Sequence, residues 1–259
     1  ILRECLPAVP VSISSEISPE FREFERTSTT VLNALLMPVV GLYLQRLEAR
    51  LSEQGFSAPV YLVQSNGGVA TPAMAARQPA RLLLSGPSGG AKAAQTVARR
   101  LDRPNLVAVD MGGTSYDVSL VEEGRVLLVN QGDVDGCPVR LPMVEMRTIG
   151  AGGGSVAGTD TVGGLFVGPE SAGAVPGPAC YGRGGKRPTV TDANVVLGRI
   201  DPQHFLGGAM QLDADAASRA VTSDVAGPLD FHLEAAAEGI IQIAVAHMAS
   251  AIRLSLFEK

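Results

Sequence analysis

The chain has 259 residues, of which 46% are hydrophobic, 18% are charged and only 4% are aromatic, and its net charge is −5. This length and apolar content suffice for one large domain or two close-packed lobes with a real core. The acidic balance, the scattered Lys and Arg residues and the lack of Trp argue against a nucleic-acid-binding protein, because they offer no basic stripe and no stacking platform.

The three cysteines, Cys5, Cys137 and Cys180, lie far apart, and no pair has the spacing of a metal site. This pattern favours reduced thiols and a cytoplasmic protein. We recognise no apolar run of membrane length and no signal peptide, so no membrane partner is expected. The chain starts at Ile1 rather than Met and reaches Lys259 inside a predicted helix, which indicates a segment of a longer protein.

The first hundred residues are predicted to contain two helices and two strands. Residues 31–53 carry apolar side chains at helical spacing, with Pro38 as a predicted kink, whereas residues 12–30 are polar and predicted to be extended. The strands are predicted over 59–64 and 81–84, a turn over 65–68, and the second helix, after a Gly-rich loop, over about 91–101.

The middle of the chain is predicted to be a β-meander, and the rest to be irregular and then helical. Strands are expected over 105–109, 116–121 and 125–130, joined by the turns 110–115 and 122–124. Because a Gly-Gly turn joins two strands here, the pattern excludes a parallel doubly wound sheet. Residues 150–188 are Gly- and Pro-rich with little regular structure expected, and helices are predicted over 189–197 and 235–257.

The turn after the first of these central strands carries the clearest chemistry, in the run Asp110-Met-Gly-Gly-Thr-Ser-Tyr-Asp117. Gly112 and Gly113 let backbone N–H groups approach a ligand, and Thr114 and Ser115 add hydroxyl donors, as suits phosphate oxygens. The flanking carboxylates of Asp110 and Asp117 would repel phosphate unless a divalent cation lies between them, and Mg²⁺ with its waters is the ion expected there. The bland alternative is an ordinary Gly-Gly hairpin that an Asp caps.

Three further motifs each allow two interpretations. The loop of Gly152, Gly153, Gly154 and Ser155 could approach phosphate or substrate, or could mark a close crossing of two elements. Cys180 could be a nucleophile, but a buried structural thiol is favoured. Asp192 could cap the helix that starts near it, or could face a substrate cleft.

Seven motifs occur in an order that resembles the hydantoinase A/5-oxoprolinase family, which also includes acetone carboxylase subunits. They are Ser65–Gly68, Leu84–Gly90, Asp110–Ser119, Thr148–Ser155, Val167–Gly173, Pro176–Gly182 and Thr189–Asn194. The resemblance covers nearly the whole chain and implies an α/β fold of the actin-like ATPase (ribonuclease H-like) type, with a mixed sheet, flanking helices and Gly-rich loops. It also implies that residues 1–259 are the ATPase core region, without the N-terminal phosphate-loop domain and the C-terminal nucleotide loop.

The resemblance implies ATP-dependent ring opening of a cyclic amide, such as a hydantoin or 5-oxoproline, through carbonyl phosphorylation. Asp110 and Asp117 would then hold Mg²⁺, Gly112–Ser115 would hold the phosphates of ATP, and Gly152–Ser155 would line the second side. Asp192 and Glu145 are candidate substrate residues, although Glu145-Met-Arg147 replaces an Asp-x-His pattern that some members carry, which puts a role tied to that His in doubt.

Two rival functions stay open at this point. One is an ATP-dependent ketone carboxylase subunit, which shares the phosphate chemistry. The other is a non-catalytic ATP-binding assembly module, which turnover of ATP by the complete protein in the absence of a lactam would test. A B-type hydantoinase subunit is the expected protein partner, and the segment alone is expected to be inactive.

Overall fold

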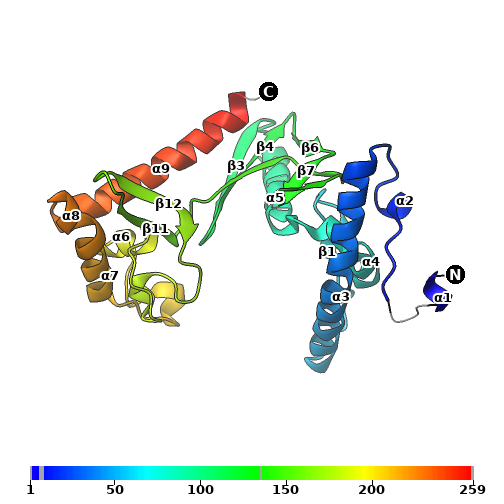
Figure 1. Ribbon diagram of the computed structural model, residues 1–259, viewed down its shortest axis with the longest axis horizontal. Helices are drawn as coiled ribbons and strands as arrows, with labels where there is room; N and C mark the ends of the chain where they lie inside the picture. The colour runs from blue at the N-terminus through cyan, green and yellow to red at the C-terminus, as the bar shows by residue number, and fades with distance from the viewer. Residues whose placement is uncertain (1, 6–8, 135, 258–259) are drawn as a thin grey trace. The chain divides into compact units, whose positions relative to one another are not determined.

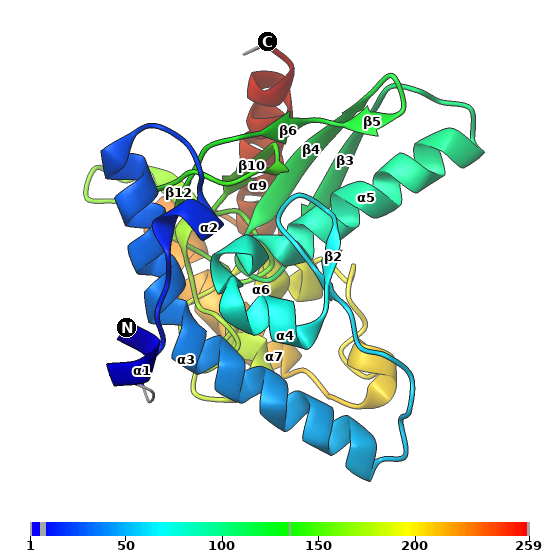
Figure 2. The ribbon, with the colours of Figure 1, turned by 90° about the vertical axis from the view of Figure 1, so that its right-hand side faces the viewer.

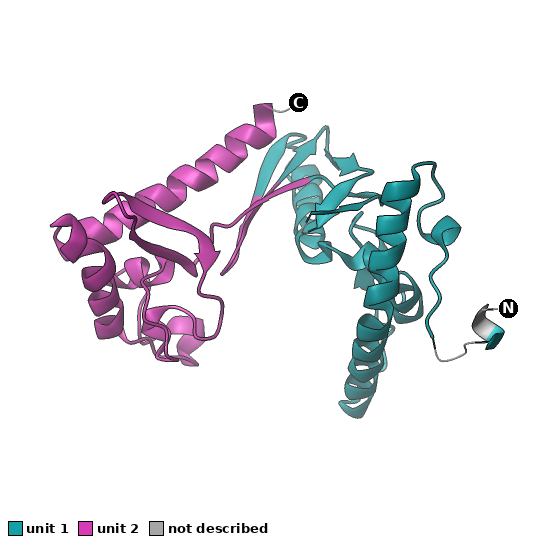
Figure 3. Ribbon diagram, viewed as in Figure 1, with its two compact units in different colours: residues 1–108, 119–145 teal, residues 109–118, 146–259 magenta. Residues whose placement is uncertain are grey.

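The computed structural model describes residues 2–5, 9–134 and 136–257, and its contacts divide the chain into two compact units (Figures 1 and 3). Unit 1 comprises residues 1–108 and 119–145, and unit 2 comprises residues 109–118 and 146–259. The chain passes from one unit to the other within strands β3 (Leu106–Met111) and β4 (Tyr116–Glu122). Helices and small antiparallel sheets make up both units, so the predicted α/β class is confirmed.

Unit 1 consists mainly of helices with short strand pairs between them. Its helices are α1 (Leu2–Cys5), α2 (Ser14–Ile17), α3 (Glu23–Glu53), α4 (Pro72–Arg77), the 3₁₀ turn η1 (Pro79–Leu82) and α5 (Ser85–Arg100). Its strands form the antiparallel pairs β1 (Leu62–Val63) with β2 (Val69–Ala70), β6 (Leu128–Val129) with β9 (Met143–Val144), and β7 (Gly132–Val134) with β8 (Cys137–Val139). A further strand, β5 (Arg125–Val126), pairs with β4. The single strand predicted over 125–130 is therefore wrong, since β5 and β6 are separate strands with different partners.

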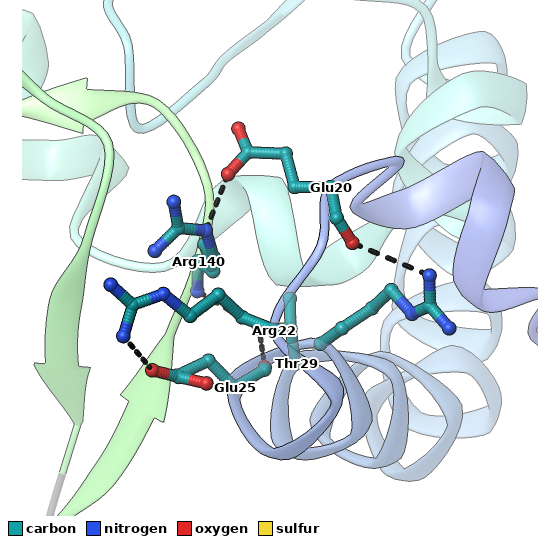
Figure 4. Close-up of polar contacts among 6 residues, drawn as sticks. Glu20, Arg22, Glu25, Thr29 and Arg140 are labelled. Atoms are coloured by element: carbon teal, nitrogen blue, oxygen red, sulfur yellow. Dashed lines mark hydrogen bonds and ion pairs between the residues drawn. The ribbon is translucent and has the colours of Figure 1, made fainter.

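Polar side chains connect α3 to neighbouring segments of unit 1 through hydrogen bonds. The fully buried Asn33 donates to Ser12 Oγ and to the carbonyl of Arg77, and its Oδ1 accepts from the amide of Ala80. At the start of the helix, Thr29 Oγ1 accepts from the amide of Arg140, whose guanidinium pairs with Glu20 (Figure 4). The bonds of Asn33 and Thr29 satisfy buried polar groups, which are costly to leave unpaired.

The opposite face of α3 stays exposed among the residues of unit 1 that the structure describes. The periodic residues Val31, Leu35 and Val39 are 51%, 66% and 68% exposed, although α3 packs beside α4 (Figure 2). By length and hydropathy, α3 and α9 (Leu233–Phe257) are long and apolar enough to span a membrane, contrary to the expectation of no such run. Each packs one face against its own unit, although only 17% of the apolar window of each helix is buried.

Three further expectations for unit 1 were wrong. Residues 81–84 are not a strand, because Pro79 starts the 3₁₀ turn η1 and the short apolar run continues it. Helix α5 begins at Ser85 rather than near residue 91, because its Gly- and Pro-rich residues lie in the first turn, where a missing amide costs no helical bond. Residues 12–30 are not extended throughout, because α2 covers Ser14–Ile17 and α3 extends back to Glu23. Helix α3 runs as one helix through Pro38.

Unit 2 combines a hairpin with a helical layer. Its strands are β10 (Met146–Ile149), β11 (Ser155–Thr159) and β12 (Leu165–Ser171); its helical elements are η2 (Ala179–Tyr181), α6 (Val190–Val196), η3 (Phe205–Gly208), α7 (Ala214–Val221), the π-turn η4 (Thr222–Ala226), α8 (Gly227–Leu229) and α9. Strands β10, β4 and β3 form a sheet in that order, and β5 lies on β4. The predicted helices α6 and α9 are confirmed to within two residues at each end.

The antiparallel pair β11–β12 corrects the expectation of little regular structure over 150–188. Its turn is closed by Asp160, whose carboxylate accepts from the amides of Val162 and Gly164. Gly158 and Gly168 within the strands, together with a register shift after Ser155, obscure the alternation that would have revealed it.

The core of unit 2 forms where α9 covers this hairpin and α6 (Figure 1). Small buried residues of α9, among them Ala236, Ala237 and Ala244, allow close approach around the buried Ile240. Further along α9, Ala251 packs against Tyr116, Val118 and Ala151. The start of β4 is thereby anchored, and with it the turn that precedes it.

Candidate active site

The predicted phosphate turn lies at an exposed end of the β3–β4 hairpin. The amide of Gly112 donates to the carbonyl of Ser115 at 2.9 Å, which closes the turn. Gly112, Gly113 and Thr114 are exposed and Ser115 is half-buried. Within the described ranges, the N–H groups of Gly113, Thr114 and Ser115 make no hydrogen bond, so these three donors are available to a ligand.

The two carboxylates lie at equivalent positions on either side of this turn. Asp110 is exposed and has no hydrogen bond or ion pair with any residue that the structure describes. Asp117 is half-buried, and its two oxygens accept from Thr148 Oγ1 at 2.5 Å and from Ser115 Oγ at 3.5 Å. Residues directly opposite each other in a hairpin lie on the same side of it, so Asp110 and Asp117 share one side of the hairpin.

This donor set fits a Mg²⁺ ion bound through water and phosphate. Magnesium in such sites is held by one or two carboxylates and completes its shell with water and phosphate oxygens. No group of three or more His, Cys, Asp or Glu side chains suited to a metal occurs among the described residues. These residues therefore do not form an all-protein metal cage. They form a pair of carboxylates beside free backbone amides.

The loop of Gly152–Ser155 contacts the turn, but its amides are already used. The N–H groups of Gly153 and Gly154 donate to the carbonyls of Gly112 and Gly113, at 3.0 and 2.6 Å. The amide of Gly152 donates to Ser155 Oγ, and that of Ser155 to the carbonyl of Gly152. Because these donors are spent, we reassign Gly152–Ser155 from phosphate contact to support of the turn.

The support of the turn includes hydroxyl groups to which the sequence analysis gave no role. Ser171 Oγ lies 3.3 Å from Thr114 Oγ1 and 3.5 Å from the carbonyl oxygen of Gly113, and it accepts from the amide of Gly173. Thr191 donates to the loop, and Thr148 to Asp117. A lone hydroxyl carries no pattern in a sequence, so tertiary contact was needed to find all three.

Asp192 is a capping residue in the interior of unit 2. Its carboxylate has no exposed surface and accepts from the amides of Thr189, Ala179 and Cys180 and from Thr189 Oγ1. A capping box with Thr189 starts α6. The capping interpretation is thus confirmed, and the carboxylate has no surface left with which to touch a substrate.

The thiol of Cys180 is equally enclosed. Burial, followed by the negative charge of Asp192, raises the pKa of this thiol far above its ordinary value. A thiol held neutral in this way is a poor nucleophile, so the structural role that the sequence favoured fits the structure. Glu145, the other candidate substrate residue, is exposed and is the last residue of unit 1, whereas the turn belongs to unit 2; its role stays a prediction.

The chain is similar to enzymes that act on lactams and ketones. It is 43% identical to the caprolactamase subunit alpha of Pseudomonas jessenii, over all of this chain and 37% of that subunit. It is 38% identical to the 5-oxoprolinase of Saccharomyces cerevisiae, over 75% of this chain and 15% of the relative. A nucleotide-free structure of acetone carboxylase, described for ATP-dependent acetone carboxylation, matches 93% of this chain and 34% of its own, with a TM-score of 0.83 and 31% identity.

The chain therefore spans about a third or less of the relatives it matches. These relatives include ATP-dependent enzymes and subunits of larger assemblies. The model of the hydantoinase/oxoprolinase family matches residues 26–259. Taken with the motifs and the turn geometry, this match shows that the chain belongs to the hydantoinase/oxoprolinase family.

Proposed function

We propose that the complete protein containing this chain uses ATP to open a cyclic amide. The observation that carries the proposal is the exposed turn with free amides at Gly113–Ser115, between the carboxylates of Asp110 and Asp117. Lactam-hydrolysing relatives such as the caprolactamase subunit support the choice of substrate class. The family's link to ATP supports the choice of cosubstrate.

The chemistry requires activation, because an amide carbonyl is a poor electrophile. Transfer of the γ-phosphoryl group of ATP to the carbonyl oxygen forms an imidate phosphate and releases ADP. Water then attacks the imidate carbon, and the ring nitrogen leaves as an amine, which gives an acyl phosphate. A second water hydrolyses the acyl phosphate to a carboxylate and inorganic phosphate. Bound Mg²⁺ would neutralise phosphate charge during the transfer.

The protein's own part in this reaction is positioning. The amides of Gly113, Thr114 and Ser115 would bind phosphate oxygens, and Asp110 and Asp117 would hold the cation and its waters. Oriented donors that need no rearrangement during the reaction stabilise developing charge more effectively than water does.

We also infer an actin-like ATPase fold for the complete core, which the strand–turn–strand phosphate loop supports. A B-type partner subunit is inferred as well, and the subunit names of relatives support it.

Substitution of Asp110 tests the proposal most directly. In the complete protein, Asp110→Ala should lower ATP turnover by at least about 100-fold, since the cation would lose a carboxylate. Asp215→Ala, which removes an exposed carboxylate from the first turn of α7, is the matched control and should leave turnover unchanged. Full activity in folded Asp110→Ala protein would remove the assignment.

Ketone carboxylation is a second candidate, favoured by the TM-score of 0.83 with acetone carboxylase. Both reactions start with phosphoryl transfer and differ in the acceptor. The complete protein with its partner should be supplied in turn with caprolactam, 5-oxoproline, a hydantoin, and acetone with bicarbonate. Product formation that depends on ATP with a lactam supports ring opening, whereas product from the ketone alone supports carboxylation.

A further inference from the structure

Two peptide groups of the turn are held by their carbonyl oxygens. The carbonyl of Gly112 shares a peptide plane with the N–H of Gly113, and the carbonyl of Gly113 shares one with the N–H of Thr114. In a trans peptide the two groups point in opposite directions. The bonds from Gly153 and Gly154 to these carbonyls therefore aim the two N–H groups away from the loop.

The loop is itself held by Thr191 at the start of α6. The backbone N–H and Oγ1 of Thr191 both donate to the carbonyl of Gly153, each at 2.8 Å. That carbonyl belongs to the same peptide group as the N–H of Gly154, which donates to Gly113. Thr191 is only 7% exposed, so water competes poorly for these bonds.

We propose that Thr191 is a positioning residue that fixes the direction of the turn amides through the Gly153–Gly154 peptide. This inference rests on the proposed function, in which those amides bind phosphate. Without Oγ1, the carbonyl of Gly153 keeps one of its two donors and the peptide gains freedom to rotate. The N–H of Gly154 then binds the carbonyl of Gly113 less firmly. The N–H of Thr114, in the same peptide group as that carbonyl, turns away from the direction in which it would bind phosphate.

The test compares variants of the complete protein in steady-state kinetics with varied ATP. Thr191→Val keeps the shape of the side chain and removes the hydroxyl. The value of kcat/KM for ATP should then fall by about 10- to 100-fold, because small misplacements of groups near a reacting centre have effects of this size. Thr191→Ser restores the donor and should stay within about threefold of wild type. Thr159→Val is the matched control, because the hydroxyl of Thr159 donates to a backbone carbonyl, that of Asp224, elsewhere in unit 2.

Melting temperatures and the binding of a fluorescent ATP analogue, measured on the same samples, separate positioning from folding. Positioning predicts that Thr191→Val binds the analogue more weakly than Thr159→Val does at equal melting temperature. Equal nucleotide binding and equal kcat/KM in these two variants would overturn the inference. If Asp110→Ala abolishes turnover in that case, the proposed function survives; if Asp110→Ala is active, the proposed function itself fails.

Discussion

Gly152 shows how a missing side chain brings two segments of unit 2 into contact. A Cβ at this position would lie 2.6 Å from the carbonyl carbon of Gly113 and 2.7 Å from the carbonyl oxygen of Gly112. Both neighbours are backbone atoms, so neither can swing aside as the end of a long side chain could. The contact between loop and turn is therefore available to glycine at this position and not to a residue with a side chain.

Gly152→Ala should consequently separate the loop from the turn. We expect loss of about 1–3 kcal/mol of stability from overpacking and a drop of about 100-fold in ATP turnover. Gly90→Ala is the control, since Gly90 lies in helix α5 and a Cβ at this position would meet no atom within 4 Å. Urea unfolding and ATPase assays of both variants measure the two effects. Turnover of wild-type size in Gly152→Ala would contradict the close contact.

The enclosure of Cys180 predicts its reactivity. Cys5 and Cys137 are exposed, whereas Cys180 has no exposed surface and its pKa is raised by burial and by Asp192. Because the thiolate is the reactive form, a group with a raised pKa stays protonated and inert at about pH 8. A disulfide reagent should modify two thiols of the native chain quickly and the third after denaturation. Equal rates for all three would contradict this.

At the scale of elements, α6 is fixed at its start by one carboxylate. Asp192 accepts four hydrogen bonds and joins the start of α6 to η2 through the amides of Ala179 and Cys180. Oδ2 of Asp192 accepts from Thr189 and from the amide of Ala179, and Oδ1 accepts from the amide of Cys180. The carboxylate thus organises the segment that carries Thr191 as well as the helix itself.

Asp192→Asn should lower the free energy of unfolding by about 2–4 kcal/mol, because the new NH₂ group faces N–H donors and leaves them unpaired. Asp213→Asn is the matched control: Asp213 caps α7 from an exposed position and should cost about 1 kcal/mol or less. Urea denaturation of both variants gives the comparison. Equal losses would show that the bridge to η2 adds nothing.

Sequence patterns predicted the elements that have a strong periodicity or a clear boundary. The apolar strand β3 and the long helix α9 were found, because a continuous apolar run and a helical spacing of apolar residues are visible in the sequence. The pair β11–β12 and the early start of α5 were missed, because glycine and proline usually mark loops. In both cases tertiary contact outweighed local preference.

For the site, the sequence predicted the turn at Gly112–Ser115 and its flanking carboxylates. It misjudged Gly152–Ser155, because a run of glycines shows that backbone comes close but not which partner it meets. It left Thr148, Ser171 and Thr191 without a role, since their partners lie between 31 and 57 residues away along the chain.

At the scale of the whole molecule, the chain holds one phosphate-type turn and spans 37% of the caprolactamase subunit it resembles. Nucleotide clefts of ATPases with two lobes draw on both lobes. We therefore expect the isolated chain to bind ATP weakly, with Kd above about 1 mM. Isothermal titration calorimetry, with the complete protein as the positive control, measures this. Micromolar binding by the isolated chain would contradict the expectation.

We expect the exposed row of Val31, Leu35 and Val39 on α3 to make the isolated chain self-associate in solution. Exposed apolar rows of this kind drive reversible self-association as protein concentration rises. Sedimentation velocity should accordingly show a weight-average mass that climbs with loading, and Leu35→Lys should flatten that climb. Calorimetry at the high concentrations that weak ligands demand would then record heats of dilution from the protein itself, which a blank titration of buffer into protein reveals.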